Sequence, residues 1–306
     1  MTGGAPRVPW TEARRRALAL LDVRGPLLVI ADFDGTLAPI TLDPLATRIE
    51  PLARVALRRL ARVADVRPDL VAPVILSGRT PGDVAGRVRV GGVRYLGDHG
   101  IAGGALPRRA RAERLAIHVP PELLDAVPQA NAVGDAVTRA LGSPAWLFVE
   151  RKGPSVAFHF RQAPDPDRAR EQVLAAVAAA EAAGGGIGLM RFEGRMVVEL
   201  RPVGAGGKGA AAERLLAELR PGAAIALGDD RTDAEAFTIL RAARARGELA
   251  ALSLGVDAGH EVPQAVLEAS DVLVGSPHDA ARVLSAVARA LERRTFTGDE
   301  PGRVVG

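Results

Sequence analysis

Cysteine is absent from the 306-residue chain, which excludes disulfides and thiolate metal sites and gives no indication of an oxidising compartment. Long hydrophobic runs are also lacking. The longest nearly uncharged stretch, residues 173–190, is mostly alanine and glycine and contains Glu181, so it is too weakly apolar for a membrane span. No small-residue cleavage site follows the short apolar patch near the N-terminus, which argues against a signal peptide. We therefore expect a cytoplasmic protein with no membrane partner.

Aromatic residues and lysine are both scarce. Only 3% of residues are aromatic, and the arginines are scattered among acids despite a formal charge of +4, so no nucleic acid partner is expected. Of the 40 basic residues, only Lys152 and Lys208 are lysines. Lysine is a compact ammonium on a flexible stem, whereas arginine is a broad planar fork. The two lysines therefore mark candidate sites where the fork would not fit, although chance survival is the alternative.

Short apolar runs that end in polar residues or glycine recur along the chain. They are residues 26–35, 72–79, 93–100, 223–230, 249–255 and 271–276. Such runs are typical of buried parallel strands, and segments with helical spacing of apolar residues lie between several of them. This alternation predicts a doubly wound, mostly parallel α/β sheet.

The middle of the chain breaks this rhythm and predicts an inserted α+β domain over residues 104–203, between core segments 1–103 and 204–306. Residues 146–150 and 155–161 flank a turn with glycine and proline, which indicates a hairpin. If its loop is residues 151–154, Glu150 pairs with Ser155, and alternation places Glu150, His159 and Arg161 on one face.

Acidic residues gather after two of the predicted strands. Asp32 and Asp34 lie two residues apart in "ADFDGT", and "LGDDRTD" supplies Asp229, Asp230 and Asp233. A lone Asp-x-Asp could be a turn that caps a helix. Because the carboxyl ends of neighbouring parallel strands meet at one sheet edge, however, the two groups are expected to come together, where carboxylates suit Mg²⁺.

The segment "PVGAGGKGAA", residues 202–211, contains the spacing GxGxxG. A dinucleotide loop usually turns straight out of its strand, whereas "RPV" intervenes here. A P-loop would need a glycine in place of Pro202 and a hydroxyl in place of Gly209. The remaining interpretation is that the turn presents Lys208 at the start of a helix, where one positive charge can balance carboxylates and phosphate.

These motifs, in this order, resemble the haloacid dehalogenase superfamily of phosphatases. Within it the chain is similar to the trehalose-6-phosphate phosphatase family, from about residue 26 to about residue 275. The motifs that support the match are "ILSGR", "GDHG", "VERKGPSVAFHFR", "VVELRP", "GGKGAA" and "LGDDRTDAEAF". The resemblance implies a Rossmann-like core with an inserted cap domain that recognises the sugar.

The resemblance also implies a reaction, namely Mg²⁺-dependent hydrolysis of trehalose 6-phosphate. We separately expect a monomer. Asp32 would be the nucleophile that forms an aspartyl-phosphate, and Asp34 would protonate the leaving oxygen and then activate water. The implied Mg²⁺ ligands are Asp32, the backbone carbonyl of Asp34, and Asp229, with Asp233 in support. The implied phosphate-binding residues are Ser77, Lys208, Gly35 and Thr36. The implied substrate-binding residues are Glu150, Lys152, Arg161, Glu199, Arg79 and His99.

Two positions depart from the family pattern. Asp98 in "GDHG" stands where a smaller or neutral polar residue is expected, and Arg151 replaces an acid. The alternatives are therefore a capped phosphatase for sucrose 6-phosphate or a glycosyl-glycerate phosphate, or a catalytically silent sugar-phosphate binding protein. A dinucleotide oxidoreductase is a third alternative function.

The segment after about residue 295 is expected to be disordered.

Overall fold

The computed structural model describes residues 4–41, 43, 46–194, 196–259 and 261–296. The chain divides into two compact units, which we call the core unit, Met1–His118 with Gly207–Gly306, and the inserted unit, Val119–Gly206. These bounds differ from the predicted insertion at residues 104–203. The expectation of a disordered tail falls, from residue 297 onward, outside the described residues, and the last helix continues to Phe296.

The core unit is built on a seven-stranded sheet in the order β11-β10-β9-β1-β2-β3-β4. Its strands are β1 (Leu27–Ala31), β2 (Val71–Leu76), β3 (Val93–Gly97), β4 (Ala102–Leu106), β9 (Ala223–Gly228), β10 (Ala250–Val256) and β11 (Val272–Val274). All neighbours are parallel except β3 and β4. Each of the six predicted apolar runs supplies one parallel strand, which confirms the doubly wound α/β architecture.

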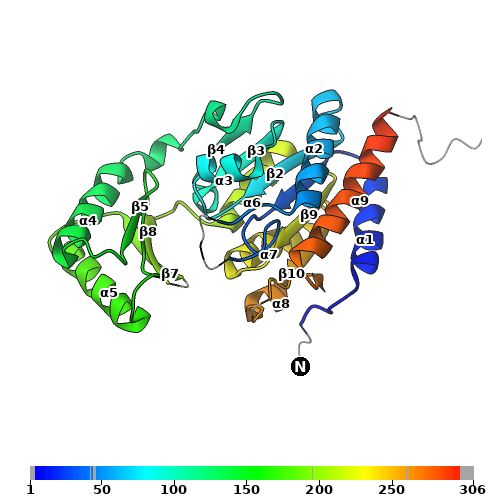
Figure 1. The fold of residues 1–306 in the computed structure, drawn as a ribbon. Coiled ribbons are helices and arrows are strands. Elements are labelled where there is room, and N and C mark those ends of the chain that lie inside the picture. Colours follow the sequence, from blue (N-terminus) through cyan, green and yellow to red (C-terminus); the bar gives the residue numbers. More distant parts are fainter. Residues whose placement is uncertain (1–3, 42, 44–45, 195, 260, 297–306) are drawn as a thin grey trace, which may run out of the picture. The chain divides into compact units, whose positions relative to one another are not determined.

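Helices cover both faces of this sheet (Figure 1). One face packs against α1 (Trp10–Ala19), α2 (Pro51–Val66), α3 (Pro81–Val88) and α9 (Pro277–Phe296), and the other against α6 (Lys208–Leu219), α7 (Arg231–Ala245) and α8 (Gln264–Ala269). The central strand β1 alternates between the two apolar clusters, with Val29 in the first and Leu28 and Ile30 in the second. A fully buried strand of this kind reads as a continuous apolar run.

Strand β4 explains why the core continues past residue 103. It pairs antiparallel with β3, and its Gly103 exchanges backbone hydrogen bonds with His118 at 2.8 and 3.0 Å. A Cβ on Gly104 would lie 2.0 Å from the Ala116 carbonyl oxygen, so the close approach of these segments requires glycine. The sequence of β4, "AGGAL", contains no β-branched or aromatic residue, and no strand was predicted there.

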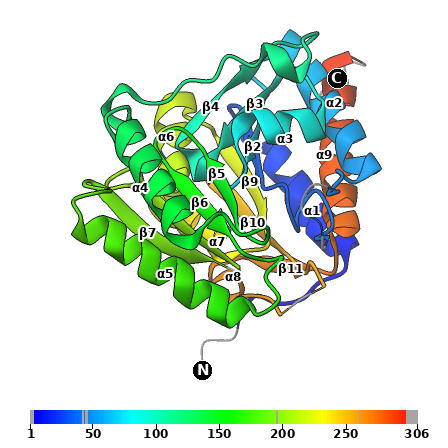
Figure 2. The ribbon, with the colours of Figure 1, turned by 60° about the vertical axis from the view of Figure 1, so that its left-hand side comes forward.

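The inserted unit contains a four-stranded antiparallel sheet in the order β5-β6-β8-β7. Its elements are α4 (Ala126–Leu141), β5 (Phe148–Arg151), β6 (Val156–His159), α5 (Pro166–Ala182), β7 (Leu189–Gly194) and β8 (Val197–Pro202). Both helices pack on one face of the sheet, around a core that includes Val133, Phe158 and Val173 (Figures 1 and 2). The other face is therefore the one open to polar side chains.

The β5–β6 hairpin forms where it was predicted, with a different register. Glu150 pairs with Ala157 and not with Ser155, because the Lys152 N–H closes a tighter loop by donating to the Ser155 carbonyl at 3.0 Å. Gly153 adopts a φ of 78° in this loop, which glycine tolerates. A shift of two residues leaves Glu150 and His159 on the same face, as predicted, whereas Arg161 lies beyond the end of β6.

Candidate active site

The ends of two adjacent strands create the site in the core unit. β1 ends at Ala31 and β9 at Gly228, and Ala31 pairs in register with Leu227. The Asp32 N–H donates to the Leu227 carbonyl at 3.0 Å, so the two chains are still held together one residue further on. Asp32 and Asp229 consequently lie at the same edge of the sheet.

Three carboxyl groups and one ammonium form a buried cluster at this edge. One carboxylate oxygen from each of Asp32, Asp229 and Asp233 lies within 4.8 Å of the others. Lys208 Nζ donates to Asp32 Oδ1 at 2.7 Å and to Asp233 Oδ1 at 2.8 Å. All four residues are at most 5% exposed. The structure thus brings together the two acidic motifs and the lysine that the sequence singled out.

Burial is the largest influence on the protonation of this cluster. It raises the pKa of Asp32 to about 8, against the opposing charge of Lys208. It also raises the pKa of Asp229 and of Asp233 well above the ordinary range. For Lys208, burial disfavours the ammonium, but the Asp233 and Asp32 carboxylates outweigh this and hold its pKa well above the usual value. The Lys208 ammonium therefore remains charged, but its single positive charge cannot balance three ionised carboxyl groups.

The donor set fits Mg²⁺. If all three carboxyl groups ionised, a single ammonium would leave net negative charge in a site with little access to water. Magnesium prefers oxygen ligands and is commonly held by one or two carboxylates together with phosphate oxygens. A divalent cation would supply the missing positive charge.

Residues flanking the acids shape the loop around them. Gly35 has a φ of 77°, and a Cβ there would lie 2.1 Å from Asp229 Oδ2, so only glycine fits. The Thr36 hydroxyl donates to Asp229 Oδ1 at 3.0 Å and orients that carboxylate. Both residues were predicted to bind phosphate. In this structure the Gly35–Thr36 segment lies against Asp229 and holds its carboxylate in place.

Asp233 has two partners besides Lys208. Its Oδ2 accepts from the N–H groups of Asp229 and Asp230 at 3.1 Å each, and the Asp230 carboxylate accepts from Thr232 and Asp233 to complete a capping box on α7. Although burial opposes it, the Lys208 charge and the Thr232 hydrogen bond lower the pKa of Asp230. The motif therefore caps α7 and at the same time contributes Asp233 to the buried acidic cluster.

The glycine-rich turn presents the lysine, as proposed from the sequence. Gly207 is the N-cap of α6, and Lys208 is its first residue. A Cβ on Gly209, the second residue of α6, would lie 3.1 Å from Glu235 Cβ on α7, so the small residue there lets α6 and α7 pack closely. From this position the Lys208 ammonium reaches the carboxylates of Asp32 and Asp233.

Asp34 has a different partner from the other acids. Arg79 Nε donates to Asp34 Oδ2 at 2.6 Å and Arg79 Nη2 to Asp34 Oδ1 at 2.7 Å, a bidentate pair. Arg79 also donates to Asp83 Oδ2 at 2.9 Å. The sequence assigned Arg79 to substrate binding, and its hold on Asp34 is a contact that sequence reasoning missed. Ser77, buried at the end of β2, accepts from the Arg79 N–H at 3.2 Å.

The "GDHG" motif packs against the same strand end. Asp98 and His99 both adopt left-handed backbone, with φ of 50° and 56°. The Asp98 N–H donates to the Arg79 carbonyl at 2.8 Å and the His99 N–H to the Ser77 carbonyl at 2.9 Å. Aspartate is among the residues enriched at positive φ. The departure at Asp98 is thus compatible with the turn that positions Ser77 and Arg79.

In the inserted unit, a second charged cluster occupies the sheet face opposite α4 and α5. Lys152 Nζ lies 2.9 Å from Glu199 Oε1 and 3.7 Å from Glu150 Oε2, and His159 Nε2 lies 2.9 Å from Glu150 Oε2. His159 and Lys152 lower the pKa of Glu150 although burial opposes them. The cluster gathers three of the predicted sugar contacts.

Arg201 and Arg161 differ from the predictions for this face. Arg201 donates to Glu199 Oε2 and lies over the Phe192 ring at 4.7 Å, although sequence reasoning did not select it. Its place in the "VVELRP" motif, two residues after Glu199, is the signal that could have identified it. Arg161 follows β6 in an exposed turn and forms no ion pair with any residue of the described ranges.

Arg151 faces away from this cluster. Its Nη2 donates to Asp135 Oδ1 on α4 at 2.6 Å, and its Nη1 donates to the Asn131 carbonyl at 3.1 Å. Arg151, which stands where an acid is expected, therefore braces the sheet against α4. It adds no charge to the face that carries Lys152, Glu150 and Glu199.

Solved structures show the class of fold. The C-terminal domain of a C. albicans trehalose-6-phosphate phosphatase is similar with a TM-score of 0.68 at 19% identity, covering 94% of this chain and 99% of that one. An Aspergillus fumigatus trehalose-6-phosphate phosphatase gives a TM-score of 0.59 at 23% identity, covering 94% and 100%. The chain therefore has the fold of these two trehalose-6-phosphate phosphatase structures.

Sequence comparison identifies the family. The trehalose-phosphatase family model matches residues 30–265, and the chain belongs to that family. The trehalose-phosphate phosphatase of Mycobacterium avium is 34% identical over 224 residues, covering 72% of this chain and 52% of that protein. The Mycobacterium marinum protein of the same name is 36% identical over 214 residues, covering 68% and 50%. The chain thus spans about half the length of the curated relatives that it matches.

Proposed function

We propose that this chain is a Mg²⁺-dependent phosphatase that hydrolyses trehalose 6-phosphate to trehalose and phosphate. The observation that carries the proposal is the buried cluster in which Lys208 bridges Asp32 and Asp233 beside Asp229. Positioned positive charge is what stabilises a transferring phosphoryl group. Membership of the trehalose-phosphatase family supports the choice of substrate.

The proposed reaction has two displacements at phosphorus. An Asp32 carboxylate oxygen attacks the phosphorus and forms an aspartyl-phosphate as the bond from phosphorus to the sugar oxygen breaks, and Asp34 gives that oxygen a proton. Asp34 then takes a proton from a water molecule, whose oxygen attacks the same phosphorus. The bond to Asp32 breaks, and inorganic phosphate leaves with both carboxyl groups restored.

Other residues of the core unit hold the reacting groups. Asp32, Asp229, Asp233 and the Asp34 carbonyl would hold Mg²⁺, which supplies charge neutralisation to the phosphoryl oxygens when bound. Ser77 and Lys208 are the proposed phosphate ligands.

Gly35 and Thr36 stay proposed phosphate ligands in addition to their contacts within the loop. The Gly35 N–H already donates to the Ala38 carbonyl at 2.8 Å, and the Thr36 hydroxyl donates to Asp229.

The inserted unit is the proposed sugar-recognition domain. Its charged face offers carboxylate acceptors at Glu150 and Glu199 and an ammonium donor at Lys152, groups that suit the many hydroxyls of a disaccharide. Arg161 and His99 stay proposed substrate contacts, each with its side chain at least partly exposed.

The decisive experiment is phosphate release from trehalose 6-phosphate, sucrose 6-phosphate, glucose 6-phosphate and a glycosyl-glycerate phosphate, each with Mg²⁺ and with chelator. Preference for trehalose 6-phosphate that disappears with chelator supports the whole proposal. Preference for another member keeps the reaction and rejects the sugar. Failure to release phosphate from every member would contradict the enzyme assignment and favour a sugar-phosphate binding protein.

We further propose that the protein acts as a monomer in the cytoplasm. The described part of the chain contains no helix that is long and apolar enough to cross a bilayer. Light scattering tests the oligomeric state, and cell fractionation tests the compartment.

A further inference from the structure

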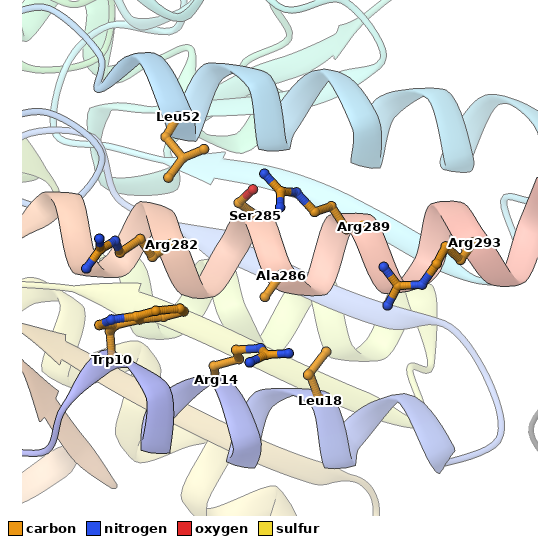
Figure 3. Close-up of a pocket in the computed structure, with 9 residues that line it drawn as sticks. All are labelled: Trp10, Arg14, Leu18, Leu52, Arg282, Ser285, Ala286, Arg289 and Arg293. Carbon is orange, nitrogen blue, oxygen red and sulfur yellow. The ribbon is translucent and has the colours of Figure 1, made fainter.

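A cavity of about 460 Å³ lies in the core unit between α1, α9 and the beginning of α2 (Figure 3). Trp10, Arg14 and Leu18 line it from α1 at a spacing of four residues, so they form one stripe on that helix. Its volume falls within the range of roughly 300 to 1,000 Å³ that is typical of small-molecule sites. None of the residues of the Asp32 and Lys208 cluster lines it, so it is a separate feature.

The lining of the cavity carries positive charge only. It includes Arg14, Arg282, Arg289 and Arg293 and no carboxylate residue. Arg14 and Arg289 form no ion pair or hydrogen bond with another residue in the described ranges, so no carboxylate of the protein neutralises them. Like charges that share a partly enclosed space repel, and an anion placed among them would remove that repulsion.

A buried hydroxyl points to the same conclusion. Ser285 lies on α9 at the cavity wall, is 4% exposed, and its Oγ has no hydrogen-bond partner in the described structure. Serine and threonine within helices commonly donate to the carbonyl four residues earlier. Thr295 does so to Leu291 on the same helix at 2.8 Å, and Thr238 to Ala234 on α7 at 2.8 Å. The Ser285 hydroxyl is therefore unsatisfied, and it can donate to a ligand oxygen once a side chain of the cavity wall turns aside, because its own surface is covered in the described structure.

The remaining wall is apolar and aromatic. Trp10, Leu18 and Leu52 are partly buried and lie around the cavity in Figure 3. The Arg282 Cζ atom lies 4.9 Å from the centroid of the Trp10 ring, and Arg282 Nη1 lies 3.7 Å from Asp279 Oδ1. A bare inorganic anion would leave this wall unused, whereas an organic group attached to a phosphate would cover it.

We propose that this cavity is a binding site for a small organic phosphate. Its phosphate group lies among the Arg14 and Arg289 guanidinium groups and accepts from Ser285, and its organic part extends from there along α1 toward Trp10. Guanidinium groups are the preferred donors to phosphate because their fork matches its oxygens. The site is independent of the proposed phosphatase reaction.

Titration calorimetry of the full chain tests the proposal, with ATP, glucose 6-phosphate and pyrophosphate as probes in buffer with chelator. We expect ATP or glucose 6-phosphate to bind saturably and more tightly than pyrophosphate. The variant Arg14→Gln with Arg289→Gln should raise the Kd at least about tenfold. The matched variant Arg58→Gln with Arg139→Gln removes the same charge from exposed helix positions outside the cavity and should change the Kd less than about twofold. Any binding at the Asp32 cluster is common to all three proteins.

Several outcomes would overturn the proposal. These are no saturable binding of any probe, equal losses in the two double variants, or pyrophosphate binding as tightly as both organic probes. Displacement of the organic probe by duplex DNA at lower concentration would indicate a nucleic acid surface instead. Ser285→Ala should weaken binding several-fold without lowering the Tm, because its hydroxyl has no partner within the protein. Unchanged affinity in that variant would remove Ser285 from the site.

Discussion

Asp32 is buried, and burial and the charge of Lys208 act on its pKa in opposite directions. It is 5% exposed and bonded to Lys208, so its replacement by asparagine keeps the shape and removes a charge that burial disfavours. We expect Asp32→Asn to lower phosphate release at least about a thousandfold, because an amide cannot form the acyl-phosphate. Phosphate-release kinetics measure the loss, and circular dichroism shows that the variant is folded. Asp65→Asn, on an exposed position of α2, is the matched control, and near-normal turnover by Asp32→Asn would reject the nucleophile.

Arg79 distinguishes a positioning role from a sugar contact. Its bidentate pair with Asp34 and its bond to Asp83 fix the carboxyl that is proposed to protonate the leaving oxygen. Arg79→Lys loses the fork, so we expect kcat to fall about ten- to a hundredfold for glycerol phosphate, whose alkoxide leaves poorly.

A substrate with a good leaving group provides the comparison. p-Nitrophenyl phosphate needs little protonation of its leaving oxygen, so Arg79→Lys should affect its turnover much less. A rise in KM confined to trehalose 6-phosphate, with kcat unchanged for every substrate, would assign Arg79 to the sugar and remove the positioning role.

Sequence predicts the identity of the site residues better than their partners. The acids follow strand ends and the lysine is one of only two, so position and rarity select Asp32, Asp229 and Lys208. The Thr36 hydroxyl meets Asp229 across 193 positions, and Arg79 meets Asp34 across 45. Such contacts depend on where loops close, and no local pattern records that.

At the scale of elements, buried parallel strands were predictable because their apolar runs are continuous. β4 was missed because its pairing depends on two glycines and on the return of the chain at His118, and not on strand propensity. The register of the β5–β6 hairpin is set by its two-residue loop, Gly153 and Pro154. The prediction assumed a four-residue loop and therefore paired Glu150 with the wrong residue. The period of two still placed Glu150 and His159 together.

The charged face of the inserted unit gives the prediction for that element. Lys152→Ala removes the ammonium between Glu150 and Glu199 and should raise the KM for trehalose 6-phosphate at least about tenfold, while p-nitrophenyl phosphate is unaffected. Arg151→Ala is the control, because that neighbouring side chain faces α4. Steady-state kinetics with both substrates decide the matter. Equal losses on both would mean that Lys152 acts on the fold or on the chemistry.

At the scale of the whole molecule, the site exists only when distant parts of the chain meet. β1 at residues 27–31 pairs with β9 at residues 223–227, and the entire inserted unit lies between them in sequence. The acids that this pairing brings together repel one another when ionised. Their repulsion opposes folding of the central strands. Stability should therefore report on the charge of the site even when no substrate is present.

The metal-free protein is expected to lose stability as the pH rises from 5 to 8. Asp32 has an ordinary pKa of 3.8 and a folded pKa of about 8, and Asp229 is shifted in the same direction, so the native state binds more protons across this window. The free energy of unfolding should fall with pH by at most about 1.4 kcal/mol per unit for each proton concerned. The Asp230 carboxyl, whose pKa is lowered, and Lys208, whose pKa is raised above its ordinary 10.5, change charge outside the window and leave the slope unaltered.

Added Mg²⁺ should reverse this trend, because a cation among the carboxylates favours their ionised form and binds only the folded chain. Urea unfolding at pH 5, 6, 7 and 8, in chelator and in excess Mg²⁺, gives both slopes. The stabilisation by Mg²⁺ should be larger at pH 8 than at pH 5, since protons compete less for the same oxygens. Asp32→Asn should flatten the slope in chelator, while Asp65→Asn should not. A metal-free protein that gains stability toward pH 8, or that ignores Mg²⁺ there, would show that Asp32, Asp229 and Asp233 do not form the metal site, whatever the enzyme hydrolyses.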